Sequence, residues 1–219
     1  MFISFEGVEG AGKSTQISRI ATWFQSLGIE VVVTKEPGGT SLGESIRKML
    51  LDPHTQIDNN NTELLLFFAD RLEHVQQVIK PALHCGKVVL CDRYIDSTWA
   101  YQQGGRELPA TLLQCLSELI TIMPDLTFLL DIHPLEGLKR ARKRGHLDRF
   151  EQSEVNFHMR VRKTYLRRAS EFSDRIKVID VMSKSVEDIF TSMTNLIRPL
   201  MSMKPINSNH GLSEEKNVN

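Results

Sequence analysis

The chain has 219 residues, of which 41% are hydrophobic, so it can bury a substantial core within one α/β domain. Its 27 basic and 27 acidic residues give a formal net charge of zero, which argues against sequence-independent binding to nucleic acid. No apolar run reaches the length of a membrane span, the chain opens on a strand-like segment, and its cysteines lack CxxC spacing. We therefore expect a reduced, soluble, cytoplasmic protein that binds neither nucleic acid nor membranes.

Five short segments rich in β-branched residues are predicted to form strands. They are nearly continuously apolar, which is typical of strands buried on both faces. Segments with apolar residues at helical spacing lie between them, so the sheet should be parallel. In chain order we expect a strand at 2–6, a helix around 17–27, a strand at 29–34, a helix around 64–79, a strand at 87–92, a helix at 111–122, a strand at 126–131, helices at 134–144 and 154–172, a strand at 176–180 and a helix at 185–201.

Two stretches lack the pattern of either element. Residues 52–62 are polar and rich in turn formers, which predicts a loop. From Ser202 onward the composition shifts to Ser, Asn, Lys and Glu, so this segment cannot bury enough apolar surface to offset the entropy of ordering it. We expect one domain over residues 1–201 and a disordered tail over 202–219.

The strongest motif lies between the first predicted strand and the first predicted helix. A Gly-x4-Gly-Lys-Ser pattern in that setting indicates a loop whose backbone N–H groups surround the phosphates of a nucleoside triphosphate. Lys13 would bridge the β- and γ-phosphates, and the Ser14 hydroxyl would coordinate Mg²⁺. The residues assigned to this ATP-binding loop are Gly7, Val8, Glu9, Gly10, Ala11, Gly12, Lys13 and Ser14.

A second polar group lies where the third predicted strand ends. Asp92 and Arg93 follow the apolar run 88–91, and ligands gather at the carboxyl ends of parallel strands. We expect Asp92 to support the Mg²⁺ shell and Arg93 to bind a phosphate with its planar fork. Taken alone, the pair would rather be a surface salt bridge, and the P-loop is what favours the phosphate-site interpretation.

Basic residues are concentrated at 139–149, where six of eleven residues are lysine or arginine. On a helix and the loop after it, they are suited to closing over phosphates, so we name residues 139–151 the lid. Arginine fits this role because its fork can bind the transferring group without losing charge. For any single one of these side chains, a solvated helix face remains the simpler interpretation.

A P-loop alone does not define an enzyme, since switches and motors also contain one. A guanine-nucleotide switch is expected to show an Asn/Thr-Lys-x-Asp segment. The nearest string, Thr34-Lys35-Glu36-Pro37, lacks the aspartate. No second large domain is predicted, so the length and motif favour a small-molecule kinase.

The chain resembles the thymidylate kinases in six segments that occur in the same order. They are EGVEGAGKS at 6–14, EPGGT at 36–40, FFADR at 67–71, DRY at 92–94, AYQ at 100–102 and LKRAR at 138–142. The resemblance covers about residues 1–200 and implies phosphoryl transfer from ATP to dTMP, with Mg²⁺, in the pathway that supplies dTTP. It also implies a P-loop nucleoside monophosphate kinase-like fold, with a five-stranded parallel sheet, flanking helices and a lid, in a homodimer.

The resemblance further implies roles in the acceptor site. Phe67 would stack on thymine, Arg71 would bind its carbonyl edge, Gln102 would make a second base contact, and Tyr101 would crowd the ribose 2′ position. Read without the family, Phe67 and Tyr101 would be assigned to the core. The remaining implied acceptor contacts are Glu9 for the sugar 3′-hydroxyl, Arg47 and Arg93 for the acceptor phosphate, and Ser97 near the same pocket.

The thymidylate kinases place their catalytic arginine either in the P-loop or in the lid. This chain has Gly10 and Ala11 where the first type carries its basic residue, so it resembles the bacterial lid type. Arg144 is then the expected catalytic arginine, and Arg140 and Arg149 are expected as supporting ATP contacts.

Transfer to an acceptor phosphate that is already ionised needs no strong general base. Catalysis is therefore assigned to Lys13, Arg93 and Arg144, and the seven histidines, which show no metal-ligand spacing, are interpreted as incidental. Two alternatives stay open. One is a kinase for another nucleoside monophosphate or for a deoxynucleoside, and the other is a P-loop ATPase that hydrolyses ATP without an acceptor.

Overall fold

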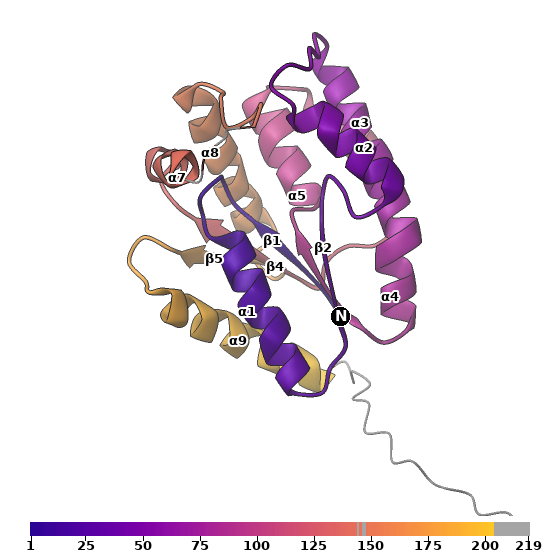
Figure 1. Cartoon of the computed structure of the whole chain (residues 1–219), viewed down its shortest axis with the longest axis vertical. Helices are drawn as coiled ribbons and strands as arrows, with labels where there is room; N and C mark the ends of the chain where they lie inside the picture. Colours follow the sequence, from indigo (N-terminus) through magenta and orange to yellow (C-terminus); the bar gives the residue numbers. More distant parts are fainter. Residues whose placement is uncertain (144, 146–147, 204–219) are drawn as a thin grey trace, which may run out of the picture.

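The computed structural model describes residues 1–143, 145 and 148–203. Helices alternate with strands along the chain, and two segments, η1 and η2, are π-helical (Figure 1). The elements are β1 (Phe2–Glu6), α1 (Lys13–Ser26), β2 (Val31–Lys35), α2 (Ser41–Leu51), α3 (Asn60–His74), η1 (Val75–Ile79), α4 (Lys80–His84), β3 (Val88–Asp92), α5 (Ile95–Thr98), η2 (Trp99–Gly105), α6 (Ala110–Ser117), β4 (Leu126–Asp131), α7 (Pro134–Arg142), α8 (Val155–Glu171), β5 (Ile176–Asp180) and α9 (Val186–Met203).

The strands form one sheet in the order β2-β3-β1-β4-β5, and every neighbouring pair is parallel. The predicted five-stranded parallel sheet is therefore confirmed. Three of the five strands have the predicted bounds, whereas β2 is displaced toward its C-terminal side. Gly28, at a φ of 73°, ends the turn after α1, and the Ile29 N–H still bonds to Phe24 of that helix, so Ile29 belongs to the turn and not to the strand.

Both faces of the sheet are covered, which explains why the strands are apolar throughout. Val88 and Leu90 of β3 belong to the core cluster that includes α1 and α9, two helices that pack against each other. The alternate residues Val89 and Cys91 point to the opposite cluster, which includes α3, η1 and α4. Figure 1 shows these two groups of helices on either side of the sheet.

The helices differ from the prediction at several places. The helix expected around 64–79 begins at Asn60 and continues through η1 into α4, where Pro81 occupies the first turn. Helix α2, with Thr40 as its N-cap, was not predicted. Helix α9 continues through Met203, so its last two residues fall in the segment assigned to the tail, whose remainder lies outside the described residues.

The carboxyl ends of β1 and β3 meet at one edge of the sheet. These strands are neighbours, with Phe5 paired to Asp92, and the N–H of Arg93 donates to the Phe5 carbonyl at 2.9 Å. The glycine-rich loop after β1 and the Asp92–Arg93 pair after β3 therefore emerge side by side. On the far side, α8 packs against η2, which brings the segment after the lid next to residues 99–105.

Candidate active site

The P-loop connects β1 to α1. Gly10 and Gly12 have φ values of 72° and 90°, which side chains rarely adopt, and Lys13 begins the helix. The Lys13 ammonium donates to the carbonyl oxygens of Gly7 and Val8 at 3.2 and 3.4 Å, so the side chain lies back across the loop. Burial lowers the pKa of Lys13, with Arg93 acting in the same direction. The loop thus gathers a cation and a helix N-terminus at one point.

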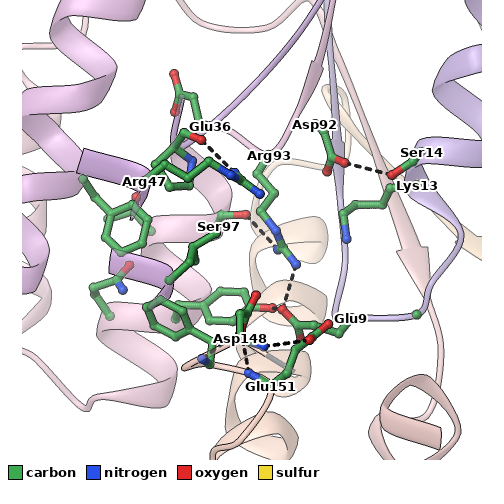
Figure 2. Close-up of a pocket in the computed structure, with 18 of the residues that line it drawn as sticks. Glu9, Lys13, Ser14, Glu36, Arg47, Asp92, Arg93, Ser97, Asp148 and Glu151 are labelled. Atoms are coloured by element: carbon green, nitrogen blue, oxygen red, sulfur yellow. Dashed lines mark hydrogen bonds and ion pairs between the residues drawn. The ribbon is translucent and has the colours of Figure 1, made fainter. Parts of the chain in front are cut away.

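Asp92 lies beside the first turn of α1. The Ser14 hydroxyl donates to Asp92 Oδ2 at 3.3 Å (Figure 2). The other carboxylate oxygen, Oδ1, is buried and has no hydrogen-bond partner among the described residues. A hydroxyl and an under-satisfied carboxylate oxygen are the hard donors that Mg²⁺ prefers, so this pair fits a magnesium ion.

Arg93 occupies the centre of the site. Its backbone is left-handed, with a φ of 71°, a conformation that costs a non-glycine residue on the order of 1–3 kcal/mol. The guanidinium donates to Glu9 at 2.9 Å, to Ser97 at 3.3 Å and to Tyr165 at 3.2 Å. Figure 2 shows the side chain extending between the Ser14–Asp92 pair and Glu9. Arg93 is thus held at both its backbone and its fork.

Glu9 is a buried carboxylate of the P-loop. Its Oε1 accepts hydrogen bonds from Arg93 and from the Tyr101 hydroxyl, the latter at 2.5 Å. Burial opposes ionisation of Glu9, but Arg93 and Lys13 outweigh it, so the pKa of Glu9 lies below its ordinary value. Its Oε2 lies 3.6 Å from Nδ1 of the buried His158. The histidine was interpreted as incidental, and the structure instead places it against a predicted site residue.

Glu6, the last residue of β1, lies behind Arg93 and was not assigned a role from the sequence. Its carboxylate accepts from the Tyr94 N–H at 2.8 Å, from Ser97 at 2.5 Å and from Tyr165 at 3.0 Å. Burial, reinforced by the nearby Asp96, raises the pKa of Glu6 to about 7. Ser97 and Tyr165 also bind Arg93, so they connect this carboxylate to the guanidinium.

A cavity of about 310 Å³ extends from the P-loop to the region between α3 and η2. It brings most of the predicted site residues together. Gly7, Val8 and Ala11 belong to the same loop without lining the cavity. The predicted residues that line it are Glu9, Gly10, Gly12, Lys13, Ser14, Arg47, Phe67, Arg71, Asp92, Arg93, Ser97, Tyr101, Gln102 and Arg140.

The far wall of this cavity contains a fully buried arginine. Arg71 donates through Nε to Glu36 at 2.7 Å and through Nη1 to Thr98 at 2.9 Å. Glu36 also contacts His74 Nδ1 at 2.9 Å, and His74 Nε2 contacts Thr34 at 2.7 Å. Burial opposes the charge of Arg71, but Glu36 outweighs it and raises the pKa of this arginine. The network fixes the direction of a guanidinium that faces the cavity.

Arg47 lines the same wall from α2, and its Nη1 donates to the Pro37 carbonyl at 2.7 Å. Phe150, just beyond the lid arginines, lies opposite. Its ring centroid is 6.0 Å from that of Phe67 and 5.7 Å from that of Tyr101. Phe150 was not predicted as a site residue, and its position in the lid is the one feature of the sequence that points to it.

Helix α7, which leads into the lid, packs directly on the P-loop. A methyl group added at Gly10 would lie 2.2 Å from the Gly137 carbonyl oxygen, and one added at Gly137 would lie 2.3 Å from the Glu9 carbonyl oxygen. Two glycines are therefore required at this contact. Arg140, one turn further along α7, lines the cavity as expected for a residue near ATP.

Arg149, expected from the sequence as a supporting ATP contact, is bound to other parts of the protein in this structure. Its Nε donates to the Leu50 carbonyl at 2.8 Å, and its Nη2 pairs with Glu63 at 2.7 Å. The Arg149 guanidinium is therefore bound between the buried carboxylate of Glu63 on α3 and the C-terminal end of α2. Arg144 lies outside the described residues.

Comparisons with known proteins agree with this arrangement of motifs. The family model for thymidylate kinase matches residues 5–193. A thymidylate kinase of Hahella chejuensis is 44% identical over 191 residues, which cover 86% of this chain and 91% of the relative. A thymidylate kinase of Ectopseudomonas mendocina is 48% identical over 182 residues, which cover 82% and 87%.

The chain belongs to the thymidylate kinase family. It is therefore a kinase, as expected. The crystal structure of thymidylate kinase from Ehrlichia chaffeensis aligns with a TM-score of 0.75 at 34% identity, over 90% of this chain and 98% of that one. The P-loop nucleoside monophosphate kinase fold is thereby confirmed. Within the described residues, no helix is long and apolar enough to cross a membrane.

Several site residues of this thymidylate kinase family member escaped sequence reasoning. Glu6, Glu36 and Glu63 are buried carboxylates with arginine partners or neighbours distant in the sequence. For Glu6 and Glu63, the signal that could have found them is a carboxylate within a strand or helix pattern, because such a residue is almost never buried unless it is paired. Glu36 instead stands in the EPGGT segment, which was noted without a role for this side chain.

Proposed function

We propose that this chain transfers the γ-phosphoryl group of ATP to dTMP, giving dTDP for dTTP synthesis. The observation that carries the proposal is that a single cavity joins Lys13 and Ser14 of the P-loop to Phe67, Arg71 and Gln102. A P-loop ATPase has no need of an aromatic side chain and a fixed arginine across from its phosphates. A nucleotide kinase needs both, because it must align an acceptor with the donor.

On the donor side, the backbone of the P-loop and the α1 N-terminus would hold the triphosphate, with Lys13 on the β- and γ-phosphates. Binding there requires the Lys13 ammonium to leave the Gly7 and Val8 carbonyls, 3.2 and 3.4 Å away, for the phosphate oxygens. Ser14 and Asp92 would hold Mg²⁺, which would neutralise charge on the phosphates. Arg140 is proposed to contact ATP from the lid.

On the acceptor side, Arg93 and Arg47 would hold the phosphate of dTMP in line with the transferring group. The acceptor oxygen is ionised at neutral pH, so the protein has to align and neutralise charge instead of removing a proton. Arg93 is proposed to be catalytic because it binds Glu9 of the P-loop and lines the cavity that joins this loop to the proposed acceptor site. Glu9, ionised by its two cationic neighbours, would accept the 3′-hydroxyl of the deoxyribose.

The thymine would lie between Phe67 and the residues at the end of the cavity. Arg71 would donate to its carbonyl edge, and Gln102 would make the second base contact. Tyr101 is held by the 2.5 Å bond to Glu9 and would crowd a ribose 2′-hydroxyl. Ser97 would support the acceptor phosphate indirectly, since it contacts Arg93 at 3.3 Å.

Arg144 is proposed as the catalytic arginine of the lid on the sequence argument alone. Arg144→Ala should lower kcat far more than it raises KM for dTMP, because the interaction belongs to the transition state. If the variant had the same kcat as the wild type at saturating substrate, Arg144 would have no part in the mechanism.

We also propose a homodimer, for which sedimentation equilibrium should give twice the 25.0 kDa mass of one chain.

The acceptor assignment is tested by comparing kcat/KM for dTMP, dUMP and UMP with ATP held at saturation. We expect dTMP to be the best acceptor, dUMP weaker because it lacks the methyl group, and UMP weakest because of its 2′-hydroxyl. If UMP is phosphorylated as efficiently as dTMP, the enzyme is a different pyrimidine nucleotide kinase.

A further inference from the structure

Glu63 is a buried carboxylate in the first turn of α3 that the catalytic scheme does not use. Its side chain is 1% exposed and does not line the cavity. It accepts from Gln102 Nε2 at 2.9 Å, from Arg106 at 3.1 and 3.2 Å, and it pairs with Arg149 at 2.7 Å. Three segments far apart in the sequence therefore meet at this one side chain.

The contact with Gln102 determines which end of that amide faces the cavity. A carboxylate held by two guanidinium groups accepts hydrogen bonds and donates none, so the amide can meet Glu63 only with its nitrogen. Turning the amide around would place its oxygen against the carboxylate, which is repulsive. Gln102 is itself 1% exposed and lines the cavity, so its carbonyl oxygen is the end that remains for a ligand.

Pyrimidine bases differ in what they present to such an oxygen. Thymine and uracil present a ring N3–H donor, whereas cytosine presents a lone pair at N3. An amide fixed with its oxygen toward the base accepts from the first two and repels the third. An amide free to turn could bind either kind of edge.

We propose that Glu63 is a specificity-determining positioning residue, which fixes the Gln102 amide so that the acceptor site selects bases with an N3–H. The inference rests on the proposed function, since it concerns the base of the acceptor nucleotide. Glu63 acts through Gln102 and does not touch the base. The ion pairs with Arg106 and Arg149 keep the carboxylate in place behind it.

The test is Glu63→Gln, which has nearly the same shape but carries an amide that can donate as well as accept. The measurement is kcat/KM for dTMP, dUMP and dCMP. We expect the preference for dTMP over dCMP to fall roughly tenfold or more, because Gln102 can now turn its nitrogen toward cytosine. The preference for dTMP over dUMP should stay unchanged, because those bases differ only in a methyl group that Gln102 does not read.

The comparison with dUMP separates a loss of Gln102 positioning from a general loosening of the pocket. A looser pocket would lower both the dTMP to dCMP and the dTMP to dUMP ratios of kcat/KM. Arg106→Met is the matched control, since it removes one ion pair of Glu63 but leaves the ion pair with Arg149 and the bond from Gln102 Nε2 to Glu63 Oε1, and it should leave both ratios as in wild type. If Glu63→Gln does not fold by circular dichroism, Glu63→Asp keeps the charge but shortens the reach to Gln102, and should give the same shift.

An unchanged dTMP to dCMP ratio in the folded variant would overturn the inference while the proposed function stands. The same would follow if Arg106→Met shifted that ratio equally, because the effect would then belong to the ion pairs. A wild-type enzyme that does not prefer dTMP over dCMP would overturn both.

Discussion

At the scale of single residues, the site is a set of cations held by buried carboxylates. Arg93 is bound to Glu9, and Arg71 to Glu36, each through a contact of 2.7–2.9 Å. A buried guanidinium without such a partner would be costly, and its direction would be undefined. The carboxylates therefore pre-organise the donors that a phosphate or a base would meet, at the expense of burying several charges.

Lys13 is the residue whose substitution should lower kcat most. Lys13→Ala removes the cation at the transferring phosphoryl group, so kcat should fall at least about 100-fold while the fold is kept. Steady-state kinetics with circular dichroism as a folding check measures this. Lys87→Ala is the matched control, because that lysine forms an ion pair with Glu30 at the surface, 2.8 Å away. A folded Lys13→Ala enzyme within a few-fold of wild type would remove the P-loop lysine from the mechanism.

Asp70 should make the stability of the fold depend on pH. Its Oδ1 accepts from the Gly38 N–H at 2.8 Å, while Oδ2 is buried with no hydrogen-bond partner among the described residues. Burial, with Glu36 acting in the same direction and Arg71 and His74 against it, raises the pKa of Asp70 to about 7 from an ordinary 3.8. The folded state therefore binds the proton more tightly than the unfolded state, and stability falls as the pH rises from about 4 to about 7.

Asp70→Asn removes this dependence, because the amide carries no charge and can still accept from Gly38. The free energy of unfolding of the variant minus that of the wild type should increase by on the order of 2–3 kcal/mol from pH 5 to pH 8. Urea unfolding of both proteins at the two pH values measures this difference. The same substitution at the exposed Asp58 should show no such difference. If the difference in free energy of unfolding between wild type and variant were the same at pH 5 and pH 8, Asp70 would be ionised in the folded protein at both pH values.

Sequence reasoning could find the residues proposed to contact ligands more readily than the residues that hold them in place. Lys13, Asp92 and Arg93 stand in motifs whose spacing follows from a strand end, so they could be placed without coordinates. Glu63 and His74 could not, because their partners lie 39 and 38–40 positions away and only the folded chain brings them together. The ion pair of Arg149 with Glu63 could not be predicted for the same reason, since nothing in the lid composition signals a carboxylate on α3.

At the scale of elements, helix α7 and the P-loop form one packed unit. Gly137 of α7 and Gly10 of the loop approach so closely that neither position has room for a methyl group. Any movement of α7 must therefore be transmitted to the loop, and α7 carries Arg140 toward the cavity. The contact also explains why a basic side chain at Gly10 would not fit this arrangement.

Gly137→Ala should separate helix propensity from packing. In an exposed helix this change stabilises by about 1 kcal/mol, but here the new methyl would lie 2.3 Å from a backbone oxygen. We expect packing to win, with a net loss on the order of 1–3 kcal/mol and a fall in kcat of about tenfold or more, because α7 must shift. Thermal unfolding measures the loss of stability and steady-state kinetics measures the fall in kcat, with Glu136→Ala on the same helix as the control. A Gly137→Ala variant that is more stable than the wild type and fully active would contradict the close packing of α7 on the P-loop.

The strands were predictable because burial on both faces leaves a continuous apolar run. Helix α2 was not predicted, because its buried face contains only Gly43, Ile46 and Leu50, while the apolar Leu42 and Met49 are exposed on it. Thr40, whose side chain accepts from the Gly43 N–H at 2.9 Å, is the capping signal that could have revealed it. The π-helical segments have no pattern of their own in the sequence.

At the scale of the whole molecule, the sheet order places donor and acceptor elements at one edge. The loop after β1 supplies the phosphate site, the residues after β3 supply Arg93, and α3 with η2 closes the far end. One cavity of about 310 Å³ spans them, so the two substrates would meet without any large rearrangement of the sheet. This convergence distinguishes a kinase from an ATPase that uses the same P-loop.

The most direct test of this account is the rate of ADP release by wild-type enzyme, with ATP and Mg²⁺, in the presence and absence of dTMP. We predict that dTMP raises the rate by well over about tenfold and that one dTDP forms for each ADP, since the acceptor completes the site and water is a poor substitute for it. ADP release at the same rate with and without dTMP would show that the chain hydrolyses ATP without an acceptor, and would contradict the central claim.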